Sequence, residues 1–206
     1  MKTNILAVVP ARIGSGRFPG KVLALVGGKP LIQRLYEEVS KSKLIDRLVI
    51  ATDSDRIFDK VRQFGGEVLM TSKRHRTGSD RVAEVMNKIG GNIVINIQAD
   101  HLGISGRMYD KILKGMLRNK TIETATIAAR VESEELLYDP NRVKVVIGDK
   151  DNALWFSRYP IPFLQGVNGN RVKKFEYYYH VGVYFYRKAV LQKFAGWKRS
   201  KLEKAE

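Results

Sequence analysis

Short apolar runs alternate with amphipathic segments through the first hundred residues. The apolar runs are nearly uninterrupted, a pattern typical of strands that a parallel sheet buries on both faces. They predict strands at residues 4–10, 48–52, 67–71 and 92–98. Apolar side chains at helical spacing, and polar residues suited to helix starts, predict helices at 30–40, at 80–89 and from a cap at Asp53 or Ser54 to Phe64.

Strands that alternate with helices in this way imply βαβ units and a parallel sheet with right-handed crossovers. Ligands of such sheets bind beyond the carboxyl ends of the strands. A polar segment follows each of the four predicted strands: residues 11–21, Asp53, residues 75–81 and Asp100. We therefore expect these four segments to meet at one edge of the sheet and to form one site.

The second half of the chain has a different pattern. Two strand-like segments, 143–147 and 153–157, flank the turn-rich loop 148–152, which predicts a hairpin. Residues 176–187 are aromatic and alternating, as in a strand. These features predict a mixed, partly antiparallel extension on the substrate side of an α/β fold.

Composition narrows the class of protein. The 206 residues suit one domain, and no apolar stretch approaches the roughly 18 residues of a membrane-spanning helix. The first residues lack the features of a signal peptide, and there is no cysteine, so a cytoplasmic protein is expected. The formal net charge of +16 favours polyanionic partners. Nucleic acid stays open as an alternative, although the basic residues are spread along the chain and no nucleic-acid-binding motif is present.

A glycine-rich loop with three cations follows the first predicted strand. Its glycines let backbone N–H groups approach phosphate oxygens, and Arg12, Arg17 and Lys21 can neutralise a triphosphate as pyrophosphate leaves. The loop is not a Walker A motif, because Ser15 stands where that motif needs glycine. It also lacks the glycine spacing of the dinucleotide-binding fingerprint. The alternative is a basic surface turn.

The loop, read as A-R-x-x-S-x-R-x-P-G-K, resembles the signature of the sugar-acid cytidylyltransferases, and specifically of the CMP-Kdo synthetases, where Kdo is 3-deoxy-manno-octulosonate. In that family the loop holds the phosphates of CTP. The resemblance implies nucleotide contacts by five residues of this segment, of which Arg12, Arg17 and Lys21 also serve catalysis: Ala11, Arg12, Ser15, Arg17 and Lys21.

Three further segments on the nucleotide side match the family. Ala-Thr-Asp at 51–53 is similar to its A-T-D, residues 75–81 resemble H-x-S-G-T-E-R, and residues 96–100 resemble V-N-x-Q-G-D. The matches imply that Asp100 binds Mg²⁺ and takes part in catalysis. They also imply nucleotide contacts by Asp53, Thr77, Gly78, Ser79, Arg81 and Gln98. Helix capping is the alternative role for Asp53, Thr77 and Ser79. Ala99, His101 and Leu102 depart from the family's Gly, Glu and Pro.

The sugar side of the family pattern recurs in the second half. Residues 140–146 are similar to P-N-x-V-K-V-V, 156–162 resemble F-S-R-x-x-I-P, 180–186 resemble H-x-G-I-Y-x-Y and 200–206 are similar to S-x-L-E-x-x-E. A sugar carboxylate would suit the planar fork of an arginine. The implied sugar contacts are Gln98, Arg158, His180, Tyr184 and Glu203.

The resemblance covers nearly the whole chain and implies a Rossmann-like nucleotidyltransferase fold with a mostly parallel sheet flanked by helices. One domain, 1–206, would hold a nucleotide-binding half at about 1–130 and a sugar-binding half at about 131–206. Relatives continue beyond Glu206 to a second metal-binding Asp, so we expect the last part of the family fold to be missing.

The implied activity is transfer of CMP from CTP to an acidic sugar with Mg²⁺ as cofactor, giving CMP-Kdo for lipopolysaccharide biosynthesis. The implied assembly is a homodimer, without nucleic acid or membrane insertion. Two alternatives stay open. The chain could act on another sugar acid, such as 8-amino-Kdo or a sialic acid, or it could be a truncated homologue that binds nucleotide with weak or no catalysis.

Overall fold

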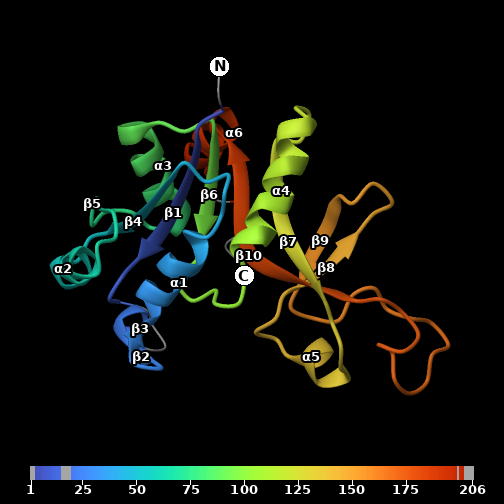
Figure 1. The fold of residues 1–206 in the computed structure, drawn as a ribbon. Helices are drawn as coiled ribbons and strands as arrows, with labels where there is room; N and C mark the ends of the chain where they lie inside the picture. Colours follow the sequence, from blue (N-terminus) through green and yellow to red (C-terminus); the bar gives the residue numbers. More distant parts are fainter. Residues whose placement is uncertain (1–2, 15–19, 199, 202–206) are drawn as a thin grey trace. The chain divides into compact units, whose positions relative to one another are not determined.

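The computed structural model describes residues 3–14, 20–198 and 200–201 (Figure 1). The chain divides into two compact units. The first comprises residues 1–125 and 183–206, and the second comprises residues 126–182. The sequence expectation placed all of 131–206 in a sugar-binding half, whereas the structure returns the chain to the first unit at Val183.

The first unit is built on a sheet whose first four strands are parallel, in the order β5 (Val68–Met70), β4 (Arg47–Thr52), β1 (Ile5–Ala11) and β6 (Ile93–Ile97). In the centre of the sheet, Val8 lies opposite both Val49 and Asn96. The last half of β10 (Tyr178–Arg187) joins β6 in the antiparallel direction. The expected mostly parallel α/β fold is confirmed.

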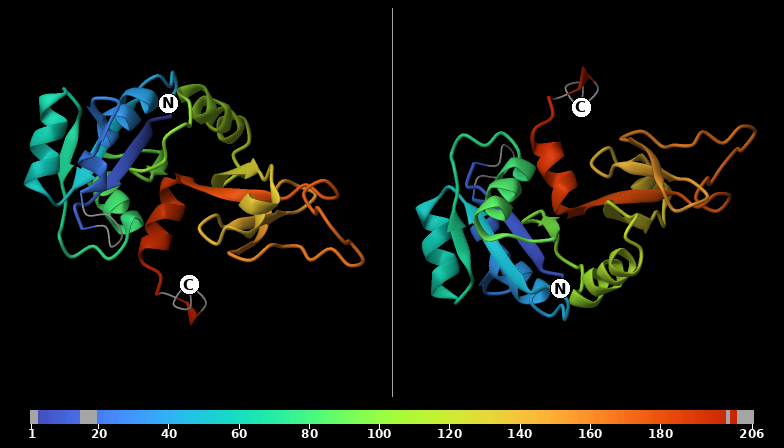
Figure 2. Two further views of the ribbon diagram at one scale, coloured as in Figure 1. Left: turned by 90° about the horizontal axis from the view of Figure 1, so that it is seen from below. Right: turned by 90° about the horizontal axis from the view of Figure 1, so that it is seen from above.

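Helices cover both faces of this sheet (Figure 2). On one face, α3 (Gly78–Ile89) and α6 (Lys188–Ala195) pack against alternate residues of the strands, with Leu6 and Val8 in the shared core. On the other face lie α1 (Leu31–Val39) and α4 (Gly106–Arg118). The remaining helix, α2 (Asp55–Gln63), packs beside β4 and β5.

A small hairpin follows β1. A 3₁₀ turn, η1 (Lys21–Leu23), leads into β2 (Leu25–Val26) and β3 (Lys29–Pro30). Gly27 and Gly28 between them have φ of 54° and 79°, a conformation that glycine adopts without steric cost. Helix α1 starts at Leu31, one residue after the expected Pro30.

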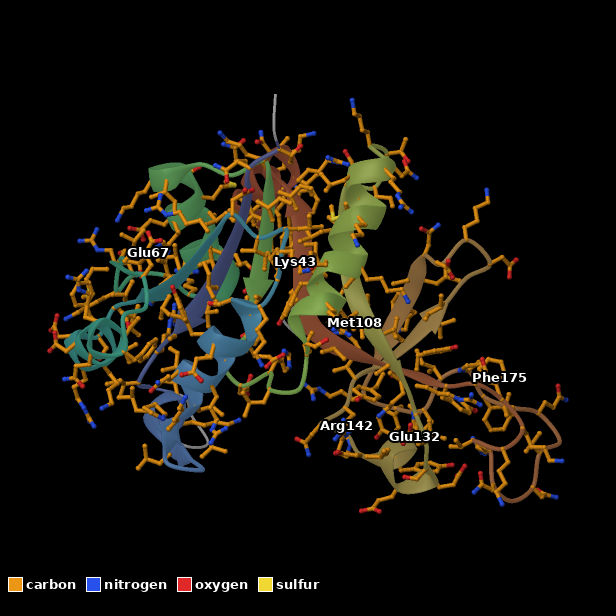
Figure 3. The ribbon with its side chains drawn as sticks, in the orientation of Figure 1. Lys43, Glu67, Met108, Glu132, Arg142 and Phe175 are labelled. Carbon is orange, nitrogen blue, oxygen red and sulfur yellow. The ribbon has the colours of Figure 1, made fainter. Side chains whose placement is uncertain are left out.

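The second unit contains most of β7 (Thr124–Arg130), α5 (Glu134–Tyr138), β8 (Lys144–Ile147), β9 (Ala153–Ser157) and the start of β10. Strands β8 and β9 form the expected antiparallel hairpin, and β10 pairs with β8 and β7. Val131, Leu137 and Tyr177 form its buried core. The guanidinium of Arg142, which Figure 3 labels, lies over the ring of Tyr179, 4.9 Å from its centroid.

Among the described residues, the sequence expectations lacked four of the longer elements, α4, β7, α5 and α6, and also the short η1, β2 and β3. Within the described residues, no helix combines the length and apolar character needed to cross a membrane.

Candidate active site

The carboxyl ends of β1, β4, β5 and β6 lie at one edge of the parallel sheet, and side chains join the loops that follow them. Arg12, after β1, donates through Nη2 to the backbone carbonyl of His75, after β5. Lys21 Nζ lies 3.0 Å from Asp100 Oδ2, after β6. Arg81 on α3 binds Asp53, after β4, at 2.6 Å. The structure therefore brings all four predicted polar segments together.

The loop after β1 closes on itself before it enters η1. The Gly20 N–H donates to the Ile13 carbonyl at 2.8 Å, and Gly20 has φ of 75°, which favours glycine. This turn places Lys21 at the start of η1. Ala11 is buried as the last residue of β1, and Arg12 is half-buried. Ser15 and Arg17 lie outside the described residues.

Lys21 and Asp100 form an accessible ion pair, because each side chain is 47% exposed. Burial raises the pKa of Asp100, but the hydrogen bond and the charge of Lys21 outweigh it, so the pKa lies below its ordinary value. Asp100 is therefore a carboxylate at neutral pH, and a cation already occupies one of its oxygens. The site thus holds both an anion-binding group and a group that binds cations.

Asp100 fits a magnesium ligand that works together with phosphate oxygens. Mg²⁺ is usually held by one or two carboxylates plus substrate phosphates and water. Among the described residues, no three His, Asp or Glu side chains gather into a complete metal site. One exposed carboxylate beside the cationic side chain of Lys21 fits a magnesium site of this kind, in which the substrate would supply the other ligands.

The turn after β6, which carries Asp100, accommodates the residues that differ from the family pattern: Ala99, His101 and Leu102. The N–H groups of His101 and Leu102 donate to the carbonyls of Gln98 and Asp100, each at 3.1 Å. Ala99 is 8% exposed and has an ordinary negative φ, so its Cβ fits and the backbone does not require glycine. Gln98 is half-buried at the end of β6.

The segment before α3 combines helix capping with close packing. Thr77 Oγ1 accepts from the Asp80 N–H, and the Asp80 carboxylate accepts from the Thr77 N–H, which makes a capping box. A Cβ on Gly78 would lie 3.2 Å from Pro10 Cγ, so glycine allows α3 to start against β1. Ser79 Oγ accepts from Asn96 Nδ2 at 3.3 Å.

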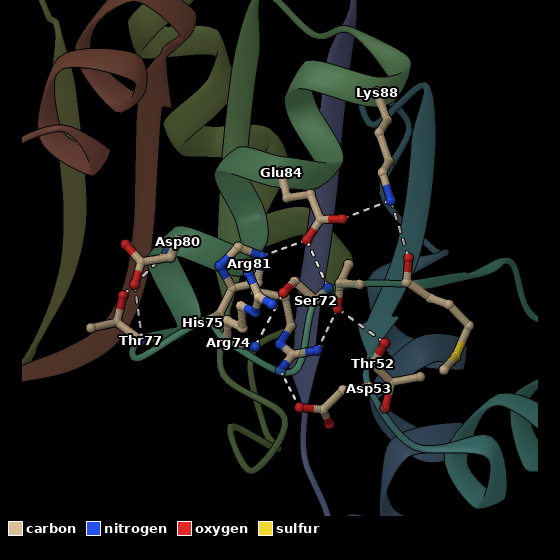
Figure 4. Close-up of polar contacts among 12 residues, drawn as sticks. Thr52, Asp53, Ser72, Arg74, His75, Thr77, Asp80, Arg81, Glu84 and Lys88 are labelled. Atoms are coloured by element: carbon tan, nitrogen blue, oxygen red, sulfur yellow. Dashed lines mark hydrogen bonds and ion pairs between the residues drawn. The ribbon is translucent and has the colours of Figure 1, made fainter.

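Arg81, for which the motif match implies a nucleotide contact, lies in the interior of the first unit, and that nucleotide contact stays a prediction. Its side chain is completely buried, with Nη1 donating to Thr71 Oγ1 and Nη2 donating to Asp53 Oδ2 (Figure 4). Its guanidinium therefore makes its hydrogen bonds in the interior of the first unit, where it fixes the carboxylate of Asp53. Asp53 was also a candidate helix cap. Ser54 occupies the N-cap position of α2 instead, and the Asp53 carboxylate pairs with Arg81.

A second network on α3 was missed by the sequence reasoning. Glu84 binds His75, the Ser72 N–H and Lys88, and so connects α3 to the loop after β5. The Glu84–Lys88 spacing of four residues was a signal of an ion pair on one helix face. Its link to His75 was not visible in the sequence.

The expected sugar contacts are divided between the units. In the second unit, Arg158 Nη1 donates to the Pro140 carbonyl at 2.9 Å, and His180 Nε2 lies 2.8 Å from Thr126 Oγ1. The His180 ring also meets Phe156 edge-on, with centroids 5.0 Å apart. Tyr184 belongs to the first unit, where it lies opposite Asn96 in the sheet. Glu203 lies outside the described residues.

Comparisons with known proteins agree with this geometry. A family model described as cytidylyltransferase matches residues 6–206. The chain is 41% identical to 3-deoxy-manno-octulosonate cytidylyltransferase of Geobacter sulfurreducens, over 98% of this chain and 84% of the relative. It is 40% identical to the protein of that name from Thermodesulfovibrio yellowstonii, over 98% and 82%.

A solved structure has nearly the same fold. It is that of CMP:2-keto-3-deoxy-manno-octonic acid synthetase complexed with CTP, with a TM-score of 0.90 and 37% identity. The similarity covers 98% of this chain and 82% of that chain.

Proposed function

The chain belongs to the cytidylyltransferase family, and from that premise we propose that it transfers CMP from CTP to 3-deoxy-manno-octulosonate (Kdo). The products are CMP-Kdo and pyrophosphate, and the use of Kdo implies a role in lipopolysaccharide biosynthesis. The observation that carries the proposal is 41% identity, over almost the whole chain, to a protein named for this activity. The chain is accordingly a nucleotidyltransferase enzyme.

The reaction needs positioning and charge neutralisation more than covalent chemistry by the protein. The anomeric hydroxyl of the sugar attacks the α-phosphorus of CTP. A new phosphorus–oxygen bond forms to the sugar, the bond from the α-phosphorus to the departing pyrophosphate breaks, and the proton of the hydroxyl passes to water. We assign phosphate binding to Arg12 and Lys21, with Arg17 as a third cation outside the described residues. Their positive charges stabilise the negative charge that develops on the departing pyrophosphate.

We propose Asp100 as the protein ligand for Mg²⁺. A bound Mg²⁺ would neutralise phosphate charge and lower the pKa of a coordinated hydroxyl. Asp100 is ionised and accessible, which suits this role. Its pair with Lys21 is exposed, and such pairs contribute only about 0.2–1 kcal/mol, so Lys21 can exchange the carboxylate for a phosphate at little cost.

The sugar acid requires a carboxylate-binding group, and we propose Arg158 for it. A guanidinium can bind a carboxylate through two parallel hydrogen bonds. Arg158 is exposed, and its contact with the Pro140 carbonyl fixes one end of the guanidinium. His180, oriented by Thr126 and Phe156, is proposed to contact sugar hydroxyls.

We further propose that the enzyme is a homodimer and works in the cytoplasm, where CTP is available. Support for a dimer comes from large apolar side chains on the surface of the second unit. Leu154 and Trp155 on β9 are 63% and 57% exposed, and Phe163 is 74% exposed. Such surfaces are typical of protein interfaces. Sedimentation velocity would test this, because a mass of one chain would contradict it.

Pyrophosphate release tests the proposed activity. The reaction contains the protein, CTP and Mg²⁺, with Kdo present or absent, and UTP in place of CTP as the nucleotide control. We expect release that requires both CTP and Kdo. A panel with 8-amino-Kdo and a sialic acid then ranks the sugar acids by kcat/KM. Release without dependence on any sugar would contradict the proposal, and binding of CTP without release would favour the nucleotide-binding homologue.

A further inference from the structure

Four side chains of α3 hold the loop that joins β5 to this helix (Figure 4). Asp80 forms the capping box with Thr77, and Arg81 binds Thr71 and Asp53. Glu84 and Lys88 lie one and two helical turns further along the helix. The loop after β5 is therefore fixed by the helix that it leads into.

Glu84 is the centre of this arrangement. Its Oε2 accepts from the Ser72 N–H at 2.9 Å and also contacts His75 Nε2, while its Oε1 lies 2.7 Å from Lys88 Nζ. Lys88 also donates to the Met70 carbonyl at 3.3 Å. Burial raises the pKa of Glu84, but the contacts with Lys88, Ser72 and His75 outweigh it and lower the pKa to about 2.

One carbonyl group, that of His75, connects the contacts of Glu84 to Arg12, to which we assign phosphate binding. The His75 side chain binds Glu84, and the His75 backbone carbonyl accepts the hydrogen bond from Arg12 Nη2. The side chains of His75 and Glu84 are only 20% and 21% exposed, so water screens their contact weakly. The position of the Arg12 guanidinium thus depends on where Glu84 holds His75.

We propose that Glu84 is a positioning residue for nucleotidyl transfer, which acts through His75 to orient the Arg12 guanidinium toward the CTP phosphates. The proposal rests on the proposed function for the role of Arg12. Glu84 itself touches neither nucleotide nor sugar. A small displacement of a charged group near reacting atoms has a large effect on rate, so a carboxylate one layer away from the site can control turnover.

The test is a double-mutant cycle of Glu84→Gln with Arg12→Ala. Glutamine keeps the size of the side chain, but it has one acceptor oxygen and no charge, so it cannot hold Ser72, His75 and Lys88 together. We expect kcat/KM for CTP to fall about tenfold, which is about 1.4 kcal/mol of transition-state stabilisation. The KM for Kdo should stay within twofold. In the Arg12→Ala background, Glu84→Gln should change kcat/KM by less than twofold.

Two matched controls separate positioning from stability. Lys88→Met removes a contact from the same carboxylate but leaves the contact with His75, so it should keep near-normal kcat/KM. Glu37→Gln removes an exposed helix carboxylate whose partners are Lys29 and Gln33, and it should leave kinetics unchanged. An equal loss from Glu84→Gln in the presence and absence of Arg12 would overturn the proposal, as would wild-type kinetics in Glu84→Gln.

Calorimetric titration with CTP measures nucleotide binding, without turnover, in the same variants of the double-mutant cycle. We expect Glu84→Gln to weaken CTP binding only when Arg12 is present. If wild-type protein gives no pyrophosphate, the proposed function fails, while the titration still decides the role of Glu84. If Glu84→Gln does not fold, His75→Ala takes its place in the same cycle, with the same expected coupling to Arg12. Additive effects would again contradict the proposal.

Discussion

The buried ion pair between Arg81 and Asp53 provides a sharp test of the structure. The Arg81 side chain has no exposed surface, and its Nη2 lies 2.6 Å from Asp53 Oδ2. Arg81→Met keeps an unbranched side chain but leaves the Asp53 carboxylate and the Thr71 hydroxyl without their donor. Breaking one partner of a buried pair costs about 3–5 kcal/mol. Asp53 is 19% exposed, so we expect the lower end, about 3 kcal/mol.

The assay is thermal and urea unfolding followed by circular dichroism. For a chain of this length, 1 kcal/mol shifts Tm by about 2–4 °C, so Arg81→Met should lower Tm by about 6–12 °C. Arg47→Met is the matched control, because Arg47 pairs with Glu67 through side chains that are 45% and 36% exposed. Exposed pairs contribute about 0–1 kcal/mol, so the control should lose at most about 4 °C.

A double-mutant cycle completes the test. Adding Asp53→Asn to Arg81→Met removes the unpaired carboxylate, so the double variant should be destabilised by less than the sum of the single variants. The reasoning would be refuted if Arg81→Met and Arg47→Met had the same midpoint. It would also be refuted if Arg81→Met kept full stability and lost only CTP binding, because Arg81 would then be a nucleotide contact.

Three further predictions concern charge at the site. Asp100→Asn should keep the fold and the Tm but lower kcat by about 100-fold or more in Mg²⁺, since one well-placed charge-stabilising group is commonly worth that much; circular dichroism and pyrophosphate release measure the two effects. Lys21→Met should raise KM for CTP about tenfold, and the pKa of Asp100, followed by carboxyl carbon NMR, should rise because Lys21 lowers it. Glu84 has a pKa of about 2 in the folded protein against 4.5 when unperturbed, so its stabilisation is present above pH 4.5 and is lost as the pH falls from 4.5 to about 2. Urea unfolding across this range should show a shallower pH dependence in Glu84→Gln, and an unchanged dependence would contradict the assignment.

The parallel sheet of the first unit was predictable because each strand is a short, buried apolar run. Residues 4–10 and 48–52 were expected to be strands, and β1 and β4 occupy them with shifts of one residue. Strand β10 was likewise expected from its alternating aromatic residues. Its antiparallel pairing with β6 depends on a contact almost ninety positions away in the sequence, which local pattern does not encode.

Helix α4 was missed although its signal is present. Tyr109, Leu113 and Met116 are buried at helical spacing, but charged residues and Gly115 interrupt the segment and dilute its apolar character. Strand β7 has no comparable signal, because its residues are mostly half-buried and do not alternate cleanly. A strand of this kind forms because tertiary contacts stabilise it, so the propensities of its own residues do not predict it.

The location of the candidate site could be predicted, but the division of labour within it could not. Motif positions after four neighbouring parallel strands necessarily lie at one edge, which explains why Arg12, Lys21 and Asp100 gather there. Sequence does not show which arginine of a motif faces solvent. Burial of Arg81 becomes visible only when β4, β5 and α3 are assembled.

The central claim is that CMP passes from CTP to Kdo, and phosphorus NMR of the complete reaction tests it most directly. With CTP, Mg²⁺ and Kdo, we predict that the α-phosphorus signal of CTP gives way to one phosphodiester signal, with one pyrophosphate formed for each CTP consumed. No conversion should occur when Kdo is left out. Unchanged CTP in the presence of Kdo, or CTP converted to CMP without any sugar, would contradict the account.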